Sequence, residues 1–155
     1  MRLNLDELEI VLLRSAYLKM KSIMGERLFC ETGGPLVGLR ERAQRIVIID
    51  LTGPGPKSKQ SMFGVEIDGN HSQHFCDERY ESSNGAYDYI GDWHCHPSFS
   101  VSPSQPDREA ISLMASVDGI VDNPVSLIAS RFTKKIHSYI WDGSDLVRVK
   151  LRIEE

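Results

Sequence analysis

The spacing of apolar and polar residues predicts a chain in which strands and helices are interleaved. Near the start, apolar residues recur at helical spacing, which predicts an amphipathic helix that opens after Asn4 and ends near Lys21. The apolar positions of this helix are Leu5, Leu8, Val11, Leu12 and Ala16. Two further helices are predicted over 70–83 and 105–117. Short β-rich runs predict strands at 35–40, 45–52, 62–67, 87–96, 125–130, 135–141 and 146–153.

These elements predict a mixed α+β fold of the α/β class, with a central mixed β-sheet packed by helices. Consecutive strands occur near both ends of the chain, which argues against a strict alternation of parallel strands and helices. The segment "GPGPKSK" at 53–59 interrupts the pattern, because proline removes a backbone donor and glycine frees the chain. At 155 residues the chain suits a single domain over 1–155.

Composition and charge exclude several classes of partner. The formal net charge is −4, and no basic run provides an electrostatic footprint for nucleic acid. The most apolar early run, "LEIVLLRSAYL", contains Glu9 and Arg14 and follows acidic residues, so we expect neither a signal peptide nor a membrane span. The three cysteines form no C-x-x-C pair, which predicts reduced thiols rather than a disulfide framework or a zinc ribbon. We therefore expect a cytoplasmic protein.

The stretch "GDWHCHPSFSVSPSQPD" at 91–107 contains the candidate chemistry. Side chains alternate along a strand, so His94 and His96 share one face while Trp93 and Cys95 share the other. Two imidazoles one pleat apart can bind one metal ion. The proline that follows ends the strand, and the chain then runs through a polar loop toward the next predicted helix.

Asp107 lies at the start of that predicted helix, where its carboxylate can come close to the two histidines. Two nitrogens and one oxygen at about 2.0–2.2 Å suit zinc, and three protein ligands leave a fourth position open for water, as in catalytic sites. The fragments also have plainer readings. H-x-H alone is a weak pattern, and "SQPD" fits a capping box in which Ser104 is the helix N-cap.

Taken in order, H-x-H, seven residues and then S-x-x-D form a more specific string. It resembles the zinc signature of the JAB/MPN domain, the JAMM metalloprotease family, at His94, His96, Ser104 and Asp107. The resemblance implies an MPN-like domain in which His94, His96 and Asp107 bind Zn²⁺ and Ser104 stabilises the oxyanion of the tetrahedral intermediate.

A zinc hydrolase also needs a proton acceptor, usually a carboxylate. Enzymes of this family take it from a glutamate upstream, and "CETGGPLVG" resembles the family's E-x-G-G-x-L-x-G wording with Glu31 as the base. Most glutamates are simply solvated, and Glu26 and Glu41 are nearby competitors. Neither competitor is followed by a pair of glycines as Glu31 is, so Glu31 is the predicted base.

"TGPGP" followed by a strand and "YIGDWHCHP" is similar to compact bacterial JAB proteins encoded beside E1- and E2-like proteins, including deconjugating peptidases of cyclic-nucleotide antiphage operons. This resemblance implies a zinc-dependent peptidase or isopeptidase in which zinc-bound water, assisted by the glutamate, attacks at the C-terminal tail of a ubiquitin-like protein or its conjugates. The implied partners are a ubiquitin-like protein or E1/E2-like conjugation components.

Three other functions are alternatives to this one. A catalytically silent MPN-type scaffold that binds such a partner stays open, although scaffolds of that kind typically lose ligands that this chain retains. A zinc deaminase needs H-x-E with P-C-x-x-C, which the sequence lacks. An amidohydrolase barrel needs about 250 residues. The remaining histidines, His71, His74 and His137, are interpreted as surface residues.

Overall fold

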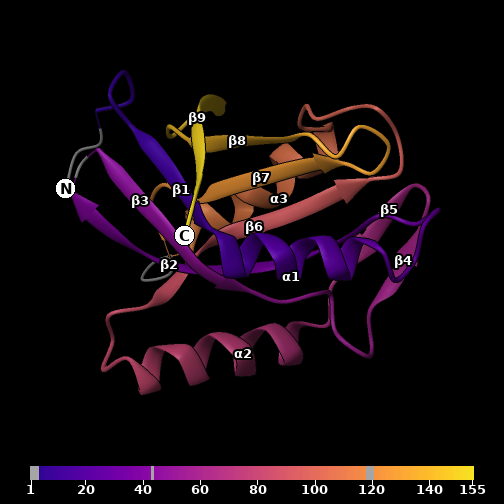
Figure 1. Cartoon of the computed structure of the whole chain (residues 1–155), viewed down its shortest axis with the longest axis horizontal. Coiled ribbons are helices and arrows are strands. Elements are labelled where there is room, and N and C mark those ends of the chain that lie inside the picture. Colours follow the sequence, from indigo (N-terminus) through magenta and orange to yellow (C-terminus); the bar gives the residue numbers. More distant parts are fainter. Residues whose placement is uncertain (1–3, 43, 118–120) are drawn as a thin grey trace.

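The computed structural model describes residues 4–42, 44–117 and 121–155. These residues form three helices and nine strands, which Figure 1 shows in chain order. The elements are β1 (Glu9–Leu13), α1 (Arg14–Met24), β2 (Thr32–Arg42), β3 (Arg45–Leu51), β4 (Lys59–Ser61), β5 (Gly64–Glu66), α2 (Gly69–Ser82), β6 (Asp88–His96), α3 (Gln105–Ser116), β7 (Val125–Ser130), β8 (Ile136–Trp141) and β9 (Leu146–Glu154). None of the helices in these ranges is both long enough and apolar enough to cross a membrane.

Seven of the strands form one mixed sheet that closes on itself in the order β1-β3-β2-β6-β7-β8-β9. Strand β1 runs parallel to both β3 and β9, and β6 runs parallel to β7, whereas the other neighbours are antiparallel. Helix α1 packs against β3, α2 against β2 and β6, and α3 against β8 (Figure 1). The predicted mixed α+β class with a central mixed sheet is confirmed.

The prediction of a helix at the start of the chain is wrong over the first half of the predicted range. Residues Glu9–Leu13 form a strand, and the helix begins only at Arg14 and continues to Met24. Ile10, Val11 and Leu12 are all fully buried, because this parallel strand is covered on both faces. The sequence of such a strand is continuously apolar. Some of its residues therefore also match the spacing of an amphipathic helix, which explains the wrong prediction.

A second correction concerns the strand predicted at 62–67. The strand is present over Gly64–Glu66 as β5, but it pairs only with β4 in a small separate hairpin, and Met62 and Phe63 lie in the exposed turn. Strand β2 begins at Thr32, earlier than the pattern predicted. The helices predicted over 70–83 and 105–117 are confirmed, and the glycine- and proline-rich segment after β3 is a break between strands as expected.

The hydrophobic core fills the closed sheet and fixes the orientation of β6. Trp93 and Cys95 are completely buried in it, so His94 and His96 lie on the other face of the strand, as the strand alternation predicted. The indole Nε1 of Trp93 donates a hydrogen bond to the carbonyl oxygen of Thr52 at 2.9 Å. A smaller apolar cluster joins Ile111 of α3 to Ile128 of β7. This cluster holds α3 against the β7–β8 part of the sheet.

Candidate metal centre

The two histidines lie at the carboxyl end of β6, between β2 and β7. In the strand ladders His94 is opposite Gly33 of β2, and His96 is opposite Ser130 of β7. Gly33 makes room for the first of these rings. A Cβ atom at that position would lie 2.3 Å from the carbonyl oxygen of Trp93 and 2.9 Å from Cδ2 of His94. Glycine therefore lets the imidazole of His94 lie close against the neighbouring strand.

Asp107 is held at the start of α3 by the predicted capping box. The backbone N–H of Ser104 donates to Oδ2 of Asp107 at 2.8 Å, and the backbone N–H of Asp107 donates to Oγ of Ser104 at 3.2 Å. The loop that leads to this cap is tied to the sheet, because the hydroxyls of Ser130 and Tyr139 donate to its carbonyl oxygens. The capping box therefore presents the carboxylate of Asp107 in a fixed direction.

The histidines and Asp107 meet in a largely buried cluster. Nε2 of His96 lies 3.1 Å from Oδ2 of Asp107, and Nδ1 of His94 lies 3.5 Å from Oδ1 of the same carboxylate. Their side chains are between 7% and 16% exposed. Little water reaches these groups, so their mutual electrostatic interactions are stronger than at the surface.

Glu31 adds a second carboxylate to the cluster. It lies directly before β2, and its backbone N–H donates to the carbonyl oxygen of Ser61 in β4 at 2.7 Å. Its Oε1 lies 3.4 Å from Nε2 of His96, and the side chain is 17% exposed. The two competing glutamates lie elsewhere: Glu26 is exposed in the preceding loop, and Glu41 is exposed and pairs with Arg45.

The pKa values of the cluster reflect burial and close contact. Burial raises the pKa of Glu31; the charge of Asp107 adds to this effect, and the charge of His96 opposes it. Burial also acts to raise the pKa of Asp107, but the hydrogen bond from His96 and other neighbours outweigh it and lower the pKa to about 2. The same hydrogen bond raises the pKa of His96, against the effect of burial. Asp107 is thus a carboxylate at neutral pH.

Comparison with known proteins identifies the family. The family described as prokaryotic homologs of the JAB domain matches residues 26–141, a range that contains all five residues of the cluster and its cap. The chain belongs to this family. The resemblance that the motifs indicated is therefore confirmed at the level of the JAB domain.

Three curated relatives of this JAB-domain protein are informative. It is 38% identical over 74 residues to the CD-NTase/cGAS isopeptidase of Escherichia coli (strain TW11681), covering 48% of this chain and 47% of that protein. It is 36% identical over 80 residues to the CD-NTase/cGAS isopeptidase of Vibrio cholerae serotype O1, covering 52% and 51%. The matched regions thus span about half the length of these relatives. The probable metalloprotease y4qB of Sinorhizobium fredii is 28% identical over 115 residues, or 73% of this chain and 70% of that protein.

A solved structure shows the same fold over nearly the whole chain. The solution structure of protein DSY2949 from Desulfitobacterium hafniense aligns with a TM-score of 0.71, covers 94% of this chain and 93% of its own, and is 19% identical in sequence. At this identity the likeness concerns the fold alone.

The side chains of His94, His96 and Asp107 are of the types that bind a metal ion, although their donor atoms do not surround one common position. Within the three described ranges no three His, Cys, Asp or Glu side chains have the spacing of a preformed metal shell. Instead, His96 and Asp107 are in direct contact. Nδ1 of His94, however, is buried and has no hydrogen-bond partner among the described residues. A buried polar atom left unpaired costs about 1–3 kcal/mol, and two imidazoles with one carboxylate are a donor set that zinc accepts.

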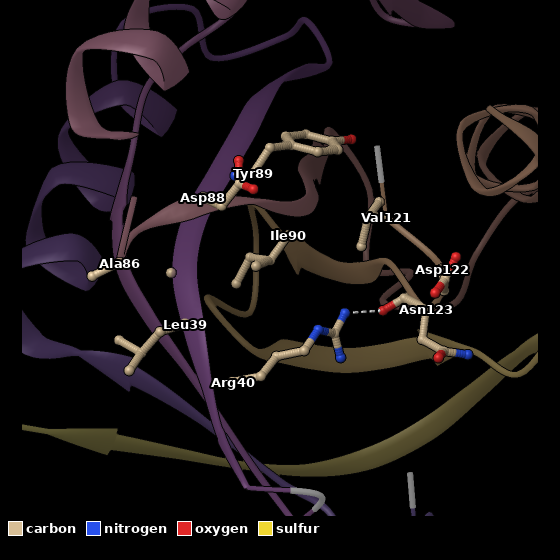
Figure 2. Close-up of a pocket in the computed structure, with 10 residues that line it drawn as sticks. Leu39, Arg40, Ala86, Asp88, Tyr89, Ile90, Val121, Asp122 and Asn123 are labelled. Carbon is tan, nitrogen blue, oxygen red and sulfur yellow. Dashed lines mark hydrogen bonds between the residues drawn. The ribbon is translucent and has the colours of Figure 1, made fainter. Parts of the chain in front are cut away.

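A separate cavity of the JAB domain lies far from this cluster. It has a volume of about 330 Å³ and is lined by Gly38 to Arg40 of β2, the start of β6 and residues 121–123. Figure 2 shows Arg40 reaching across it to donate a hydrogen bond to the carbonyl oxygen of Asn123. Asp88 in its wall is six residues from His94 along β6, which corresponds to about 20 Å. The cavity therefore belongs to the opposite end of the strand.

Two neighbours of Glu31 were not found by reasoning from the sequence. Ser61 contacts Glu31 through a backbone carbonyl group, and such a contact leaves no trace in side-chain type. Arg131 is buried and donates to the carbonyl oxygen of Cys30, the residue before Glu31. The available signal for Arg131 was a charged residue directly after the apolar strand at 125–130.

Proposed function

We propose that this JAB-domain protein is a zinc-dependent peptidase or isopeptidase that cleaves at the C-terminal tail of a ubiquitin-like protein or its conjugates. The observation that carries the proposal is the contact of Glu31 with a buried cluster of two histidines and an aspartate. These residues come from the start of β2, the end of β6 and the start of α3. Family membership and relatives named as isopeptidases or a metalloprotease support it.

In this proposal His94, His96 and Asp107 hold the zinc ion. When bound, zinc supplies a Lewis acid that polarises a carbonyl group and acidifies water. The capping box fixes the carboxylate of Asp107, and the packing of β6 on β2 fixes His94. Nδ1 of His94 can offer a lone pair to a cation in the tautomer that carries its proton on Nε2.

Glu31 acts as the general base. Its carboxylate takes a proton from the attacking water, and it returns a proton to the amine nitrogen when the carbon–nitrogen bond breaks. Burial raises its pKa, which brings the carboxylate closer to the range in which it can both accept and return a proton near neutral pH. The hydrogen bond from its backbone to Ser61 holds it beside His96.

Ser104 stabilises the negative charge that develops on the substrate carbonyl oxygen. Its Oγ already accepts the N–H of Asp107 in the capping box, so the hydroxyl is held beside the ligand cluster. Its O–H remains the donor that can point toward a developing oxyanion. The serine thus serves both the helix and the reaction.

The substrate assignment rests on the relatives. Two of them are named CD-NTase/cGAS isopeptidase, which supports an amide bond between a protein tail and another protein as the target. We propose a ubiquitin-like protein as the donor of that tail and E1/E2-like conjugation components as partners. The whole unit over 1–155 is proposed to act as a single domain.

The test compares Glu31→Gln with Glu26→Gln and with wild-type protein. We expect about one zinc per chain in all three, measured by elemental analysis. Cleavage of a ubiquitin-like fusion should fall about 10²- to 10⁴-fold in Glu31→Gln alone, because only that change removes the base. An active Glu31→Gln protein would exclude the assigned base. Zinc binding and partner binding with no cleavage by the wild type would instead establish the silent scaffold.

A further inference from the structure

Arg131 is a buried cation that joins the segment carrying Glu31 to the strand carrying the histidines. It follows directly after β7 and is only 4% exposed. Two guanidinium nitrogens donate to carbonyl oxygens, Nη1 to that of Met24 and Nη2 to that of Cys30, the latter at 2.9 Å, whereas the buried Nε has no hydrogen-bond partner among the described residues. A buried arginine held in this way connects pieces of backbone through its fixed donor geometry.

The two carbonyl groups lie at the two ends of the loop that leads to Glu31. Met24 is the last residue of α1, where helix carbonyl groups lack partners and a cation is favoured. Cys30 is the residue immediately before Glu31. Residues 25–29 between them are exposed, so this loop has little packing of its own. The guanidinium group therefore closes the loop across its ends.

The backbone of Arg131 contacts the other half of the site. Its N–H donates to the carbonyl oxygen of His96 at 3.1 Å, which continues the parallel pairing of β6 and β7 by one residue. One residue thus contacts the backbone of His96 and the backbone next to Glu31. Glu31, whose Oε1 lies 3.4 Å from Nε2 of His96, is also tied by its backbone hydrogen bond to Ser61.

We propose that Arg131 is the positioning residue that holds Glu31 at the histidine–aspartate cluster. This inference rests on the proposed function, because it concerns the base of that reaction. Arg131 itself touches no reacting atom and acts through the backbone of Cys30. Displacement of a reacting group by about 1 Å can lower a rate about 10²-fold.

The kinetic test compares Arg131→Met and Arg131→Lys with Arg40→Met. Arg40 is the control, because it is half-buried and likewise donates to a backbone carbonyl group, but at the far end of β6. We expect kcat to fall about 10- to 100-fold in both Arg131 variants with KM within about twofold, since the base is misplaced while binding is unchanged. Lysine should not rescue, because it lacks the fork that spans two carbonyl groups. Equal losses in Arg40→Met would overturn the proposal.

A double-mutant cycle with Glu31→Gln separates positioning from general stability. If Arg131 acts through the base, Arg131→Met should change the residual kcat of Glu31→Gln by less than about twofold. A purely structural role predicts the same fold loss in both backgrounds, and that result would overturn the proposal. Zinc content is measured in every variant and should stay at the wild-type level.

A second readout does not depend on activity. Cys30 is half-buried, Cys95 is buried, and burial raises the pKa of Cys76 to about 12, so alkylation of the metal-free protein reports chiefly on the Glu31 loop. We expect Arg131→Met to speed alkylation of Cys30 at least about fivefold, and Arg40→Met to leave it unchanged. An unchanged Cys30 rate refutes the proposal. If the wild type cleaves no substrate, the proposed function fails while this measurement still decides whether Arg131 holds the loop.

Discussion

At the scale of single residues, Ser104 combines a helix cap with the proposed oxyanion donor. Ser104→Ala removes the side chain that accepts the N–H of Asp107, so we expect a loss of about 0.5–2 kcal/mol in the free energy of unfolding. It also removes the hydroxyl donor, which should lower kcat about 10²- to 10³-fold. Melting temperature and cleavage of a ubiquitin-like fusion are measured side by side.

Ser104→Asp is the variant that separates the two roles. Aspartate caps helices as well as serine does, so the protein should remain folded. Its negative charge would stand where the oxyanion develops, so we expect no cleavage. A stable and fully active Ser104→Asp protein would leave Ser104 with the capping role alone.

Gly33 matters because it has no Cβ atom. In Gly33→Ala the new Cβ would meet the backbone oxygen of Trp93 at 2.3 Å, and backbone in a closed sheet cannot move aside cheaply. We expect a lower melting temperature and weaker zinc binding, because the ring of His94 is displaced.

The matched control for this variant is Gly69→Ala at the start of α2. A Cβ there would have no atom of the described part of the chain within 4 Å. This change should leave zinc binding intact and stability unchanged or slightly higher, since alanine lowers the entropy of the unfolded chain. Thermal unfolding and zinc titration of the two variants together test the steric argument, and equal behaviour would contradict it.

At the scale of elements, α2 is capped by a carboxylate that makes its stability depend on pH. Asp68 accepts backbone N–H groups from His71 and Lys57, and these hydrogen bonds, that of His71 first, lower its pKa. A carboxylate whose pKa is lowered in the folded state stabilises the fold at pH values above its pKa in the unfolded chain, about 3.9. This contribution is lost as the pH falls through the pKa of the folded state. Asp68→Asn keeps a good cap without charge. We expect wild type to melt above Asp68→Asn at pH 7, and the gap to close below about pH 4.

The control for this measurement is Glu81→Gln, at the other end of the same helix. A carboxylate near a helix C-terminus is not favoured by the helix dipole, so its removal should not lower the melting temperature at pH 7. A gap between wild type and Asp68→Asn that stayed constant from pH 7 to pH 3 would contradict the capping argument.

The elements that the sequence predicted well are those with local signals. The capping box of α3 and the alternation along β6 each depend on a few adjacent residues, and both are confirmed. Strand β1 was misassigned because its burial comes from β3 and β9, which lie far away in the chain. Similarly, the contact of Glu31 with the β4–β5 hairpin requires knowledge of the tertiary fold. The roles assigned to the five candidate site residues stay predictions.

At the scale of the whole molecule, zinc binding should stabilise the fold by mass action. An ion that binds only the folded state at 100 times its Kd adds about 2.7 kcal/mol, which raises the melting temperature of a protein of this size by roughly 5–10 °C. We expect this shift for wild type with Zn²⁺ and not with Mg²⁺, which prefers oxygen ligands. His94→Ala should show no shift, and a full shift in that variant would place the ion elsewhere.

The parallel pairing of β1 with β9 has a consequence for synthesis on the ribosome. Leu12 pairs with Ile153, so the sheet joins its earliest strand to its latest one. While β9 is still inside the exit tunnel, the nascent sheet has two unpaired edges, β1 and β8, and such edges invite pairing with other chains. Premature release before Leu146 should therefore produce an aggregating polypeptide, even though every residue of the candidate metal centre has already been translated.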